Sequence, residues 1–372
     1  MTVLLIISIS CNKNNNPTLT TIEVENYSYP LTLIKEKETK IDAVIKGVPV
    51  LAKIKSQDRI FVKIYNKEGN TEFLVYNNGL EFQKKNLIYR GQGPNECLQT
   101  LVMGGTENNI IIYDGMPQKY YIYTADLENR KTLNAKQHIE SGWIPHGVDF
   151  SEKNNAFLTC LSRIIGPGVF EYHLYIRKIE GTGIKDTEIF KIENNVYSKK
   201  KLFIAAHPIH FSLIDDYVYI LKPDEYQITK MNLDGKIIKK VQVVNLEKVR
   251  FTNQERERWV QERGLNKSRF TCPEYLWHAC WILELGDGIA IGRRENYKPV
   301  TKEWGDADYF DKDLNFLGKI KLPWFSDWNF PDQLMSDIFF QSKGNMLFFI
   351  QTRESETDEE FWLTRWRIKD EK

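Results

Sequence analysis

The feature that most constrains the fold of this 372-residue chain is a recurring pair of short strands. Each instance has a polar turn, a short apolar run, a loop and a second run rich in β-branched and aromatic residues, which is the pattern of β-strands. Six instances follow one another, beginning at the turn residues Asp58, Asn108, Asn154, Asp215, Asp287 and Gly344. Their spacing of roughly 45–70 residues is typical of repeated β units with long loops. The pattern predicts an all-β fold, a six-bladed β-propeller with four-stranded antiparallel blades.

The last repeat offers a check on this prediction. After its expected third strand, Phe361–Ile368, too few residues remain to form an outer strand. An alternating run without a partner, Leu19–Tyr27, lies near the other end of the chain. We expect this N-terminal strand to complete the last blade, because closure of the ring leaves no open sheet edge.

One segment departs from the β pattern. The run from Thr252 to Glu255 has the form of a capping box, with a hydroxyl at the N-cap and a carboxylate at the third helical position. The sequence therefore predicts a short helix, Asn253–Arg263, inserted between the fourth and fifth blades. Its many charged residues are typical of a solvent-exposed helix.

Composition and charge limit the classes of partner. The chain has 51 Lys and Arg against 50 Asp and Glu, a net charge of +1. Nucleic-acid-binding domains carry a basic excess, so we expect no nucleic-acid partner. Residues 18–372 are expected to form one monomeric domain, since radial repetition lets a single closed domain reach this length.

Residues 1–17 have the features of an export signal and a polar tether. A short apolar run ends at Cys11 and is followed by an Asn-rich stretch, which resembles a bacterial lipoprotein signal with Cys11 as the lipidated residue. Ser8 replaces the usual Leu, and no basic residue precedes the apolar run. Asn12 rather than Asp follows the cysteine, so the resemblance implies attachment to the outer membrane by a lipid anchor only. Export would permit a disulfide between Cys272 and Cys280, although free thiols are the default.

A loop at the junction of the first two blades resembles a known family. The run from Tyr89 to Glu96 contains Gly91, Gly93, Pro94 and Glu96 in a G-x-G-P-x-E pattern. This pattern is similar to a signature of uncharacterised six-bladed propeller lipoproteins, which are distant relatives of NHL-repeat propellers. We expect the two glycines to allow the turn between blades and Glu96 to cap the backbone.

Three histidines occupy nearly equivalent positions in successive blades. His146, His207 and His278 each precede the second strand of a blade by a similar number of residues, at the start of the inner strand. One hypothesis is that they converge at the channel mouth, where they could hold a divalent metal or transfer protons. The alternative is that each imidazole bonds a neighbouring carbonyl. No other cofactor is predicted.

Aromatic and basic residues on the same loops suggest a ligand class. Trp324 and Trp328 lie in a loop with two prolines, and Arg293 follows an expected strand. Exposed indole rings with guanidinium groups suit stacking on sugars and pairing with carboxylates. Packing between blades is the alternative role for the tryptophans.

The sequence leaves three classes of function open, the last of them a purely structural subunit of an envelope complex. The first is an envelope-anchored binding or scaffold module for a glycan, a peptide or a partner protein. The second is an enzyme, a polysaccharide lyase or hydrolase, with a histidine-lined site at the channel mouth. The chain contains no G-x-S-x-G elbow, P-loop or H-E-x-x-H motif. Whether the protein is catalytic is therefore undecided at this level.

Overall fold

The computed structural model describes most of the chain. The described residues are 19–23, 31–42, 49–56, 58–93, 96–98, 100–106, 109–114, 119–124, 129–134, 144–151, 153–166, 169–180, 183–195, 197–198, 201–203, 209–246, 250–262, 266, 268, 270–271, 275, 279–293, 307–321, 340–354 and 359–370. Most of them lie in strands, so the all-β prediction is confirmed.

The described strands form sheets of three to eight strands. Within these sheets, 24 of the strands can be grouped into six antiparallel sets of four neighbouring strands, which we call units one to six. The first three units contain β3 (Val50–Leu51), β5 (Arg59–Tyr65), β6 (Thr71–Asn77) and β7 (Phe82–Ile88); β8 (Thr100–Thr106), β9 (Ile110–Asp114), β10 (Lys119–Tyr123) and β11 (Asn129–Asn134); and β12 (Ile144–Ser151), β13 (Ala156–Gly166), β14 (Val169–Glu180) and β15 (Gly183–Asn195).

The last three units follow the same order from inner to outer strand. They contain β18 (His210–Ile214), β19 (Tyr217–Lys222), β20 (Gln227–Asn232) and β21 (Ile237–Val244); β23 (Ala279–Leu285), β24 (Gly288–Arg293), β25 (Ala307–Asp311) and β26 (Phe316–Lys321); and β27 (Phe340–Lys343), β28 (Met346–Glu354), β29 (Glu359–Asp370) and β2 (Leu31–Lys40).

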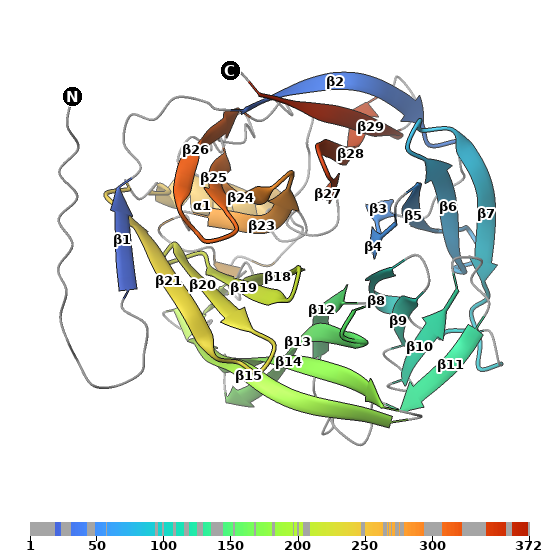
Figure 1. Ribbon diagram of the computed structural model, residues 1–372, viewed down its shortest axis with the longest axis horizontal. Helices are drawn as coiled ribbons and strands as arrows, with labels where there is room; N and C mark the ends of the chain where they lie inside the picture. The colour runs from blue at the N-terminus through green and yellow to red at the C-terminus, as the bar shows by residue number, and fades with distance from the viewer. Residues whose placement is uncertain are drawn as a thin grey trace.

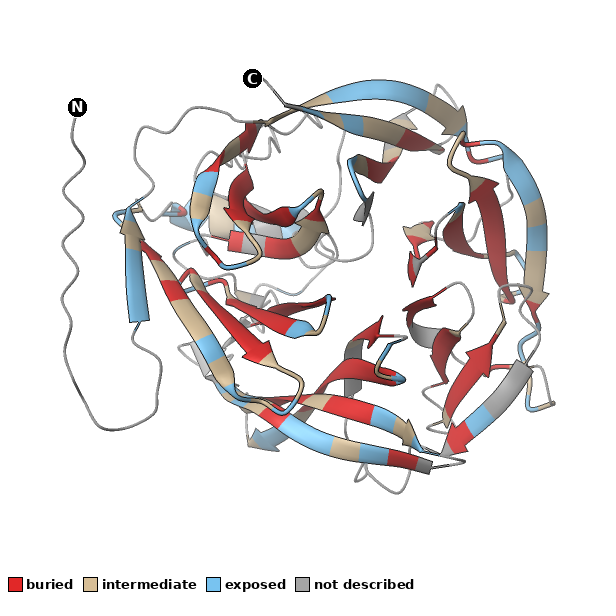
Figure 2. Cartoon of the chain, viewed as in Figure 1, coloured by how far each residue is buried: buried red, intermediate tan, exposed pale blue. Residues whose placement is uncertain are grey.

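The units are arranged around a common centre, with the first strand of each unit innermost (Figure 1). Five hydrophobic clusters lie between them, and each combines side chains from neighbouring units. Figure 2 shows buried residues concentrated in the inner strands and exposed residues in outer strands such as β7, β15 and β2. The inner strands are buried on both faces and the outer strands are partly exposed, so the sheets pack against one another mainly through their inner strands.

The prediction that every sheet has four strands is wrong. β1 (Leu19–Glu23) adds a parallel fifth strand to β21, and β4 (Lys53–Lys55) adds one to β8. A two-residue parallel contact between β2 and β26 joins units five and six into one eight-stranded sheet. Three short strands, β16 (Tyr197–Ser198), β17 (Lys201–Phe203) and β22 (Phe270–Thr271), form a separate sheet. These additions cover sheet edges that would otherwise be open to pairing.

A different N-terminal strand from the expected one completes the last unit. The run predicted for this role, Leu19–Tyr27, contains β1, which pairs with unit four. The outer strand of unit six is β2, which pairs antiparallel with β29 over most of its length. Cross-strand ion pairs accompany this pairing, since Glu36 contacts Arg365 and Arg367, and Leu31 and Leu33 of β2 pack against the neighbouring hydrophobic cluster. A strand exposed on its outer face needs few apolar residues, and this explains why the polar sequence of β2 was not recognised.

The inserted helix is confirmed as α1 (Asn253–Glu262). Its N-terminus has the expected capping box, in which Thr252 N donates to Glu255 Oε2 at 2.7 Å and Glu255 N donates to Thr252 Oγ1 at 3.2 Å. Two backbone donors at the helix start are thereby satisfied.

Hairpin turns of neighbouring units meet at one end of the strands, the end that holds the turns between the first and second and between the third and fourth strands of a unit. The Lys153 ammonium in unit three contacts the Asp216 carboxylate in unit four, and Lys312 Nζ in unit five lies 3.0 Å from Asp215 Oδ2. Gly286 N donates to Gly344 O at 2.9 Å between units five and six. We call this end the hairpin end. Each unit has an even number of antiparallel strands, so the chain passes between units at the opposite end, the connection end.

Candidate functional site

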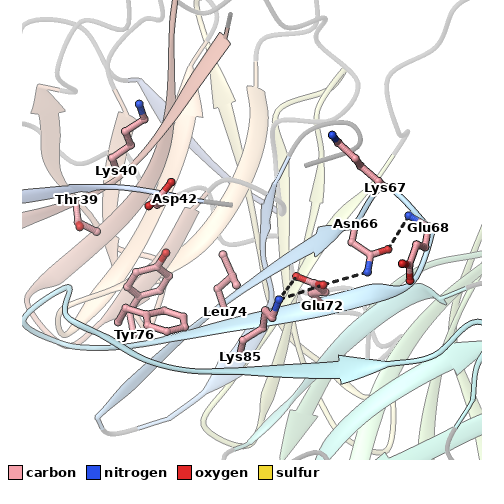
Figure 3. A pocket seen from close by; sticks show the side chains of 11 residues that line it. Thr39, Lys40, Asp42, Asn66, Lys67, Glu68, Glu72, Leu74, Tyr76 and Lys85 are labelled. Atoms are coloured by element: carbon pink, nitrogen blue, oxygen red, sulfur yellow. Dashed lines mark hydrogen bonds and ion pairs between the residues drawn. The ribbon is translucent and has the colours of Figure 1, made fainter. Parts of the chain in front are cut away.

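A groove of about 860 Å³ lies on the outer side of unit one, beside the end of β2 (Figure 3). The turn between β5 and β6, the adjacent face of β6 and the strand β7 form one wall, and β2 forms the other. Its lining residues are Thr39, Lys40, Asp42, Asn66, Lys67, Glu68, Glu72, Leu74, Tyr76, Phe82 and Lys85.

The floor of the groove follows from strand alternation in β6. Glu72, Leu74 and Tyr76 are spaced two residues apart, so their side chains point to the same face. All three side chains are buried, and Leu74 and Tyr76 belong to the cluster between units six and one. Glu72 therefore places a carboxylate at the edge of an apolar interface.

Hydrogen bonds fix the polar end of the groove. Asn66 Nδ2 donates to Glu72 Oε1 at 3.0 Å, while the Asn66 Oδ1 atom accepts from the backbone N–H groups of Glu68 and Asn70 at 3.1 and 2.9 Å. Lys85 Nζ lies 3.4 Å from Glu72 Oε2. An Asx turn thus holds the Asn66 amide in place, and the carboxylate of Glu72 is oriented before any ligand arrives.

The other end of the groove is aromatic. The rings of Tyr76 and Phe82 pack edge to face, with centroids 5.8 Å apart, and Phe82 is 56% exposed. Burial, with a smaller contribution from the charge of Asp42, raises the pKa of Tyr76 to about 12. The Tyr76 hydroxyl is therefore protonated at neutral pH and is a poor general base, since catalytic bases have pKa values near the working pH.

A second ion-pair region continues from the groove along β2. Lys40 Nζ donates to Glu360 Oε1 at 2.7 Å, and this hydrogen bond raises the pKa of Lys40. Next to it, Arg353 contacts the Glu38 carboxylate and lies over the Trp362 ring, 4.4 Å from the centroid. The β2 wall is therefore tied to unit six by charged and cation–π contacts.

The histidine hypothesis concerns residues that the structure does not describe at the side-chain level. His146 belongs to β12, whose backbone is described, while His207 and His278 lie outside the described residues. Trp324, Trp328, Pro94 and Cys11 also lie outside them. Convergence at the channel mouth thus remains a prediction.

Arg293 is an interior residue of unit five rather than an exposed loop residue. It ends β24, is only 3% exposed, and its Nη1 lies 3.3 Å from Asp308 Oδ1. The Tyr226 hydroxyl of unit four also donates to the Asp308 carboxylate. Trp281 is likewise buried in a cluster between units, the packing role that is the usual alternative for such a tryptophan.

The G-x-G-P-x-E loop forms a compact turn. Gly93 N donates to Glu96 Oε2 at 2.7 Å, and Cys97 N donates to Tyr89 O at 3.0 Å. A Cβ atom at Gly91 would lie 1.9 Å from Glu96 Oε2. A larger residue at position 91 would therefore displace the Glu96 carboxylate from its bond to Gly93 N. The loop serves the structure of the junction and lies outside the groove.

The described residues contain neither a candidate metal site nor a candidate membrane-spanning helix. Among the described residues, no group of three or more His, Cys, Asp or Glu side chains is placed to hold a metal ion. The helix α1 is too short and too polar to cross a bilayer, and the described residues contain no other candidate. Cys97 and Cys160 are buried free thiols, while the side chains of Cys272 and Cys280 are not described.

The groove residues were missed in the sequence analysis. Asn66 and Glu72 lie beside and within the two strands predicted for this unit, Phe82 and Lys85 lie in β7, which was not predicted, and none of the four belongs to a chemical motif. One sequence feature could have indicated the groove: Glu72 is an acidic residue on the same strand face as the apolar residues Leu74 and Tyr76.

Solved structures from Bacteroides resemble this chain in fold. A member of the DUF4221 family from Bacteroides vulgatus matches with a TM-score of 0.54 and 10% identity, over 92% of this chain and 99% of that chain. A Bacteroides fragilis protein described as a candidate exported protein matches with a TM-score of 0.49 and 13% identity, over 95% and 100% of the two chains. No protein-family model and no curated protein matches the sequence. At these identities the first match bears on the fold alone, an all-β chain of several sheets.

Proposed function

We propose that this chain is an exported, lipid-anchored binding module that holds a neutral glycan in the groove beside β6 and β7. The six four-stranded units around one centre are the arrangement expected of a six-bladed β-propeller. The sequence ending at Cys11 supports export and lipidation. Because a propeller fold hosts many functions, the ligand class must come from the groove itself.

The observation that carries this proposal is the pairing of an exposed aromatic ring with a fixed carboxylate in one groove. The Phe82 ring offers an apolar face to a pyranose ring, and the buried Glu72 carboxylate can accept hydrogen bonds from sugar hydroxyl groups. Three lysines and three acidic residues line the groove, so it carries no net charge. This balance favours a neutral glycan over a polyanion.

A variant of the aromatic ring tests the proposal directly. The purified protein would be applied to an array of neutral, uronate and sulfated oligosaccharides, and the best binder would be measured by calorimetry. We expect a neutral oligosaccharide to bind, and Phe82→Ala to weaken binding at least tenfold, or about 1.4 kcal/mol.

Tyr89→Ala is the matched control, because Tyr89 is 57% exposed and does not line the groove. Its affinity should equal that of the wild-type protein. Binding confined to anionic glycans, or equal losses in the two variants, would contradict the assignment of the groove.

A further inference from the structure

The N-terminal strand β1 is attached to the outer edge of unit four. It pairs in parallel with β21, from Leu19 opposite Lys240 to Glu23 opposite Val244. Most of its side chains are exposed, and Ile22 alone packs against the cluster between units four and five. Backbone pairing rather than side-chain burial therefore holds this strand, and the pairing fixes the direction in which the chain arrives.

That direction points to the hairpin end. β21 begins at Ile237, just after the turn at Asp234 and Gly235, and runs toward the connection end. Because β1 is parallel to β21, its first residue is the one nearer the hairpin end. Leu19 faces the fourth residue of β21, so it lies about 10 Å from the start of that strand at ~3.3 Å per residue.

The segment before β1 is short. Cys11 precedes Leu19 by eight residues, a span of at most about 28 Å when fully extended and about 16 Å for a flexible chain. To place a lipid at the connection end, this segment would have to reverse direction and run back along unit four.

We infer that β1 sets the orientation of the domain on the membrane, with the hairpin end toward the bilayer and the connection end away from it. The inference rests on the proposed lipid at Cys11. In this orientation the connection end, where the chain passes from one unit to the next, faces the surroundings rather than the lipid.

One feature favours the opposite orientation, in which the connection end faces the bilayer: an exposed apolar tip at that end, which we call the apolar tip. Ile164 and Ile165, at the end of β13, are 64% and 44% exposed. Nearby, Arg163 and Lys191 both contact Glu171, so their positive charge is already paired. These two described basic residues therefore add little attraction to anionic headgroups. The competing orientation, with the tip inserted in lipid, is therefore disfavoured and is directly testable.

The test uses two matched positions in unit four. Asp234→Cys lies in the turn at the hairpin end and Asp224→Cys in the turn at the connection end; both aspartates are exposed. Each lipidated variant, and Ile164→Cys, would be labelled with a fluorescent probe and placed in phosphatidylcholine vesicles containing a headgroup nitroxide lipid. The unmodified protein corrects for labelling of the native cysteines. We expect severalfold stronger quenching at position 234 than at 224 or 164.

Two further measurements separate the possible failures. Co-flotation of the protein with the vesicles reports the anchor itself, and its loss would refute the proposed lipidation. With flotation intact, equal quenching at 234 and 224, or stronger quenching at 224 or 164, would overturn the orientation. A flexible twenty-residue insertion after Thr18 should equalise the two turn positions while flotation persists. An unchanged difference in that variant would show that β1 does not set the orientation.

Discussion

Charged side chains gather in two regions of this protein, and they are used differently. One region is the groove beside β6 and β7. The other is a row on the face of β14 that packs toward unit two, formed by Glu171, His173, Tyr175 and Arg177 at alternate positions of the strand. We call this second region the polar row. Both contain carboxylates beside cations and aromatic rings, yet only the groove offers a cavity to a ligand.

The charged groups of the polar row have ionic partners on β13, β14 and β15, although the buried Arg177 Nε atom makes no hydrogen bond. The Glu171 carboxylate contacts Lys191 and lies 2.7 Å from Arg163 Nε, and His173 Nδ1 lies 2.6 Å from Glu188 Oε2. Arg177 is fully buried, and its Nη1 donates to the Tyr120 hydroxyl at 3.1 Å. Burial of these groups requires such pairing.

The groove differs because its polar groups are only partly enclosed. Lys85 is about half exposed at its side chain, and it meets Glu72 at the outer limit of an ion pair. A ligand could replace Lys85 or water there without breaking a buried network. The comparison therefore suggests that the polar row stabilises the fold and that the groove serves binding, a division that variants can test.

The largest effect is expected at Arg177. Arg177→Met should destabilise the protein by about 3 kcal/mol, since removal of one partner leaves the other groups of a buried ion pair uncompensated. Arg177 Nη2 lies 3.4 Å from Asp186 Oδ2, and the guanidinium carbon lies 5.3 Å from the Tyr120 ring centroid. Denaturant unfolding measures the free energy of unfolding.

Arg163→Met is the matched control for this prediction. Arg163 belongs to the same region, but its side chain is 36% exposed, so its replacement should cost no more than about 1 kcal/mol. Glycan affinity should be unchanged in both variants. Equal destabilisation by the two would show that burial does not distinguish them.

Acid should weaken the polar row through Glu171. Its pKa falls from 4.5 to about 2, first because Lys191 donates a hydrogen bond and then through Arg163 and His173. A carboxylate with a lowered pKa in the folded state adds stability that is complete above pH 4.5 and is lost as the pH falls toward 2. We expect this carboxylate to contribute roughly 2 kcal/mol to the free energy of unfolding, a reduced value because the partner lysine is exposed and its charge is screened.

The measurement is the free energy of unfolding from pH 6 to pH 2, compared with Glu171→Gln. The variant should start less stable, and its stability should fall less steeply with acid. If the free energies of unfolding of the two proteins fall equally with decreasing pH, protonation of Glu171 does not cause the acid sensitivity.

The positions of the buried strands could be predicted from the sequence, but the pairing partners of the outer strands could not. Unit one illustrates what was predictable, because the pair of runs that follows the turn residue Asp58 corresponds to β5 and β6. Short apolar runs bounded by turn residues report such buried strands directly. The outer strand β2, by contrast, is polar and pairs with β29 at the far end of the chain. The local pattern contains no information on such a pairing, because its contacts come from residues more than 300 positions apart in the sequence.

The candidate site was not predictable for a related reason. The groove exists because unit one meets the end of β2, so its walls come from distant parts of the chain. Glu72 has the appearance of a solvent-facing residue when strand Thr71–Asn77 is considered alone. Its burial and its contact with Asn66 depend on the neighbouring turn and unit.

A smaller effect on stability is expected in the groove. Glu72→Gln keeps the shape of the side chain, so we expect at most about 1 kcal/mol of destabilisation but about tenfold weaker glycan binding, or ~1.4 kcal/mol. Glu81→Gln is the control, because Glu81 accepts from Asn77 Nδ2 at 2.8 Å much as Glu72 accepts from Asn66, yet it does not line the groove. Calorimetry should separate the two variants. Loss of stability in Glu72→Gln as large as in Arg177→Met would place Glu72 with the structural residues.

The smallest effect is expected at the surface pair that joins the turns of units three and four. Lys153 and Asp216 are exposed, and their hydrogen bond raises the pKa of Lys153 and lowers that of Asp216. Exposed pairs contribute little, because solvent and salt screen them. Lys153→Gln should therefore leave the midpoint of thermal unfolding unchanged at physiological salt. A clear decrease in this midpoint would mean that contacts between turns hold neighbouring units together. Exposed charge pairs at the hairpin end would then stabilise the fold as the buried pairs of the polar row do.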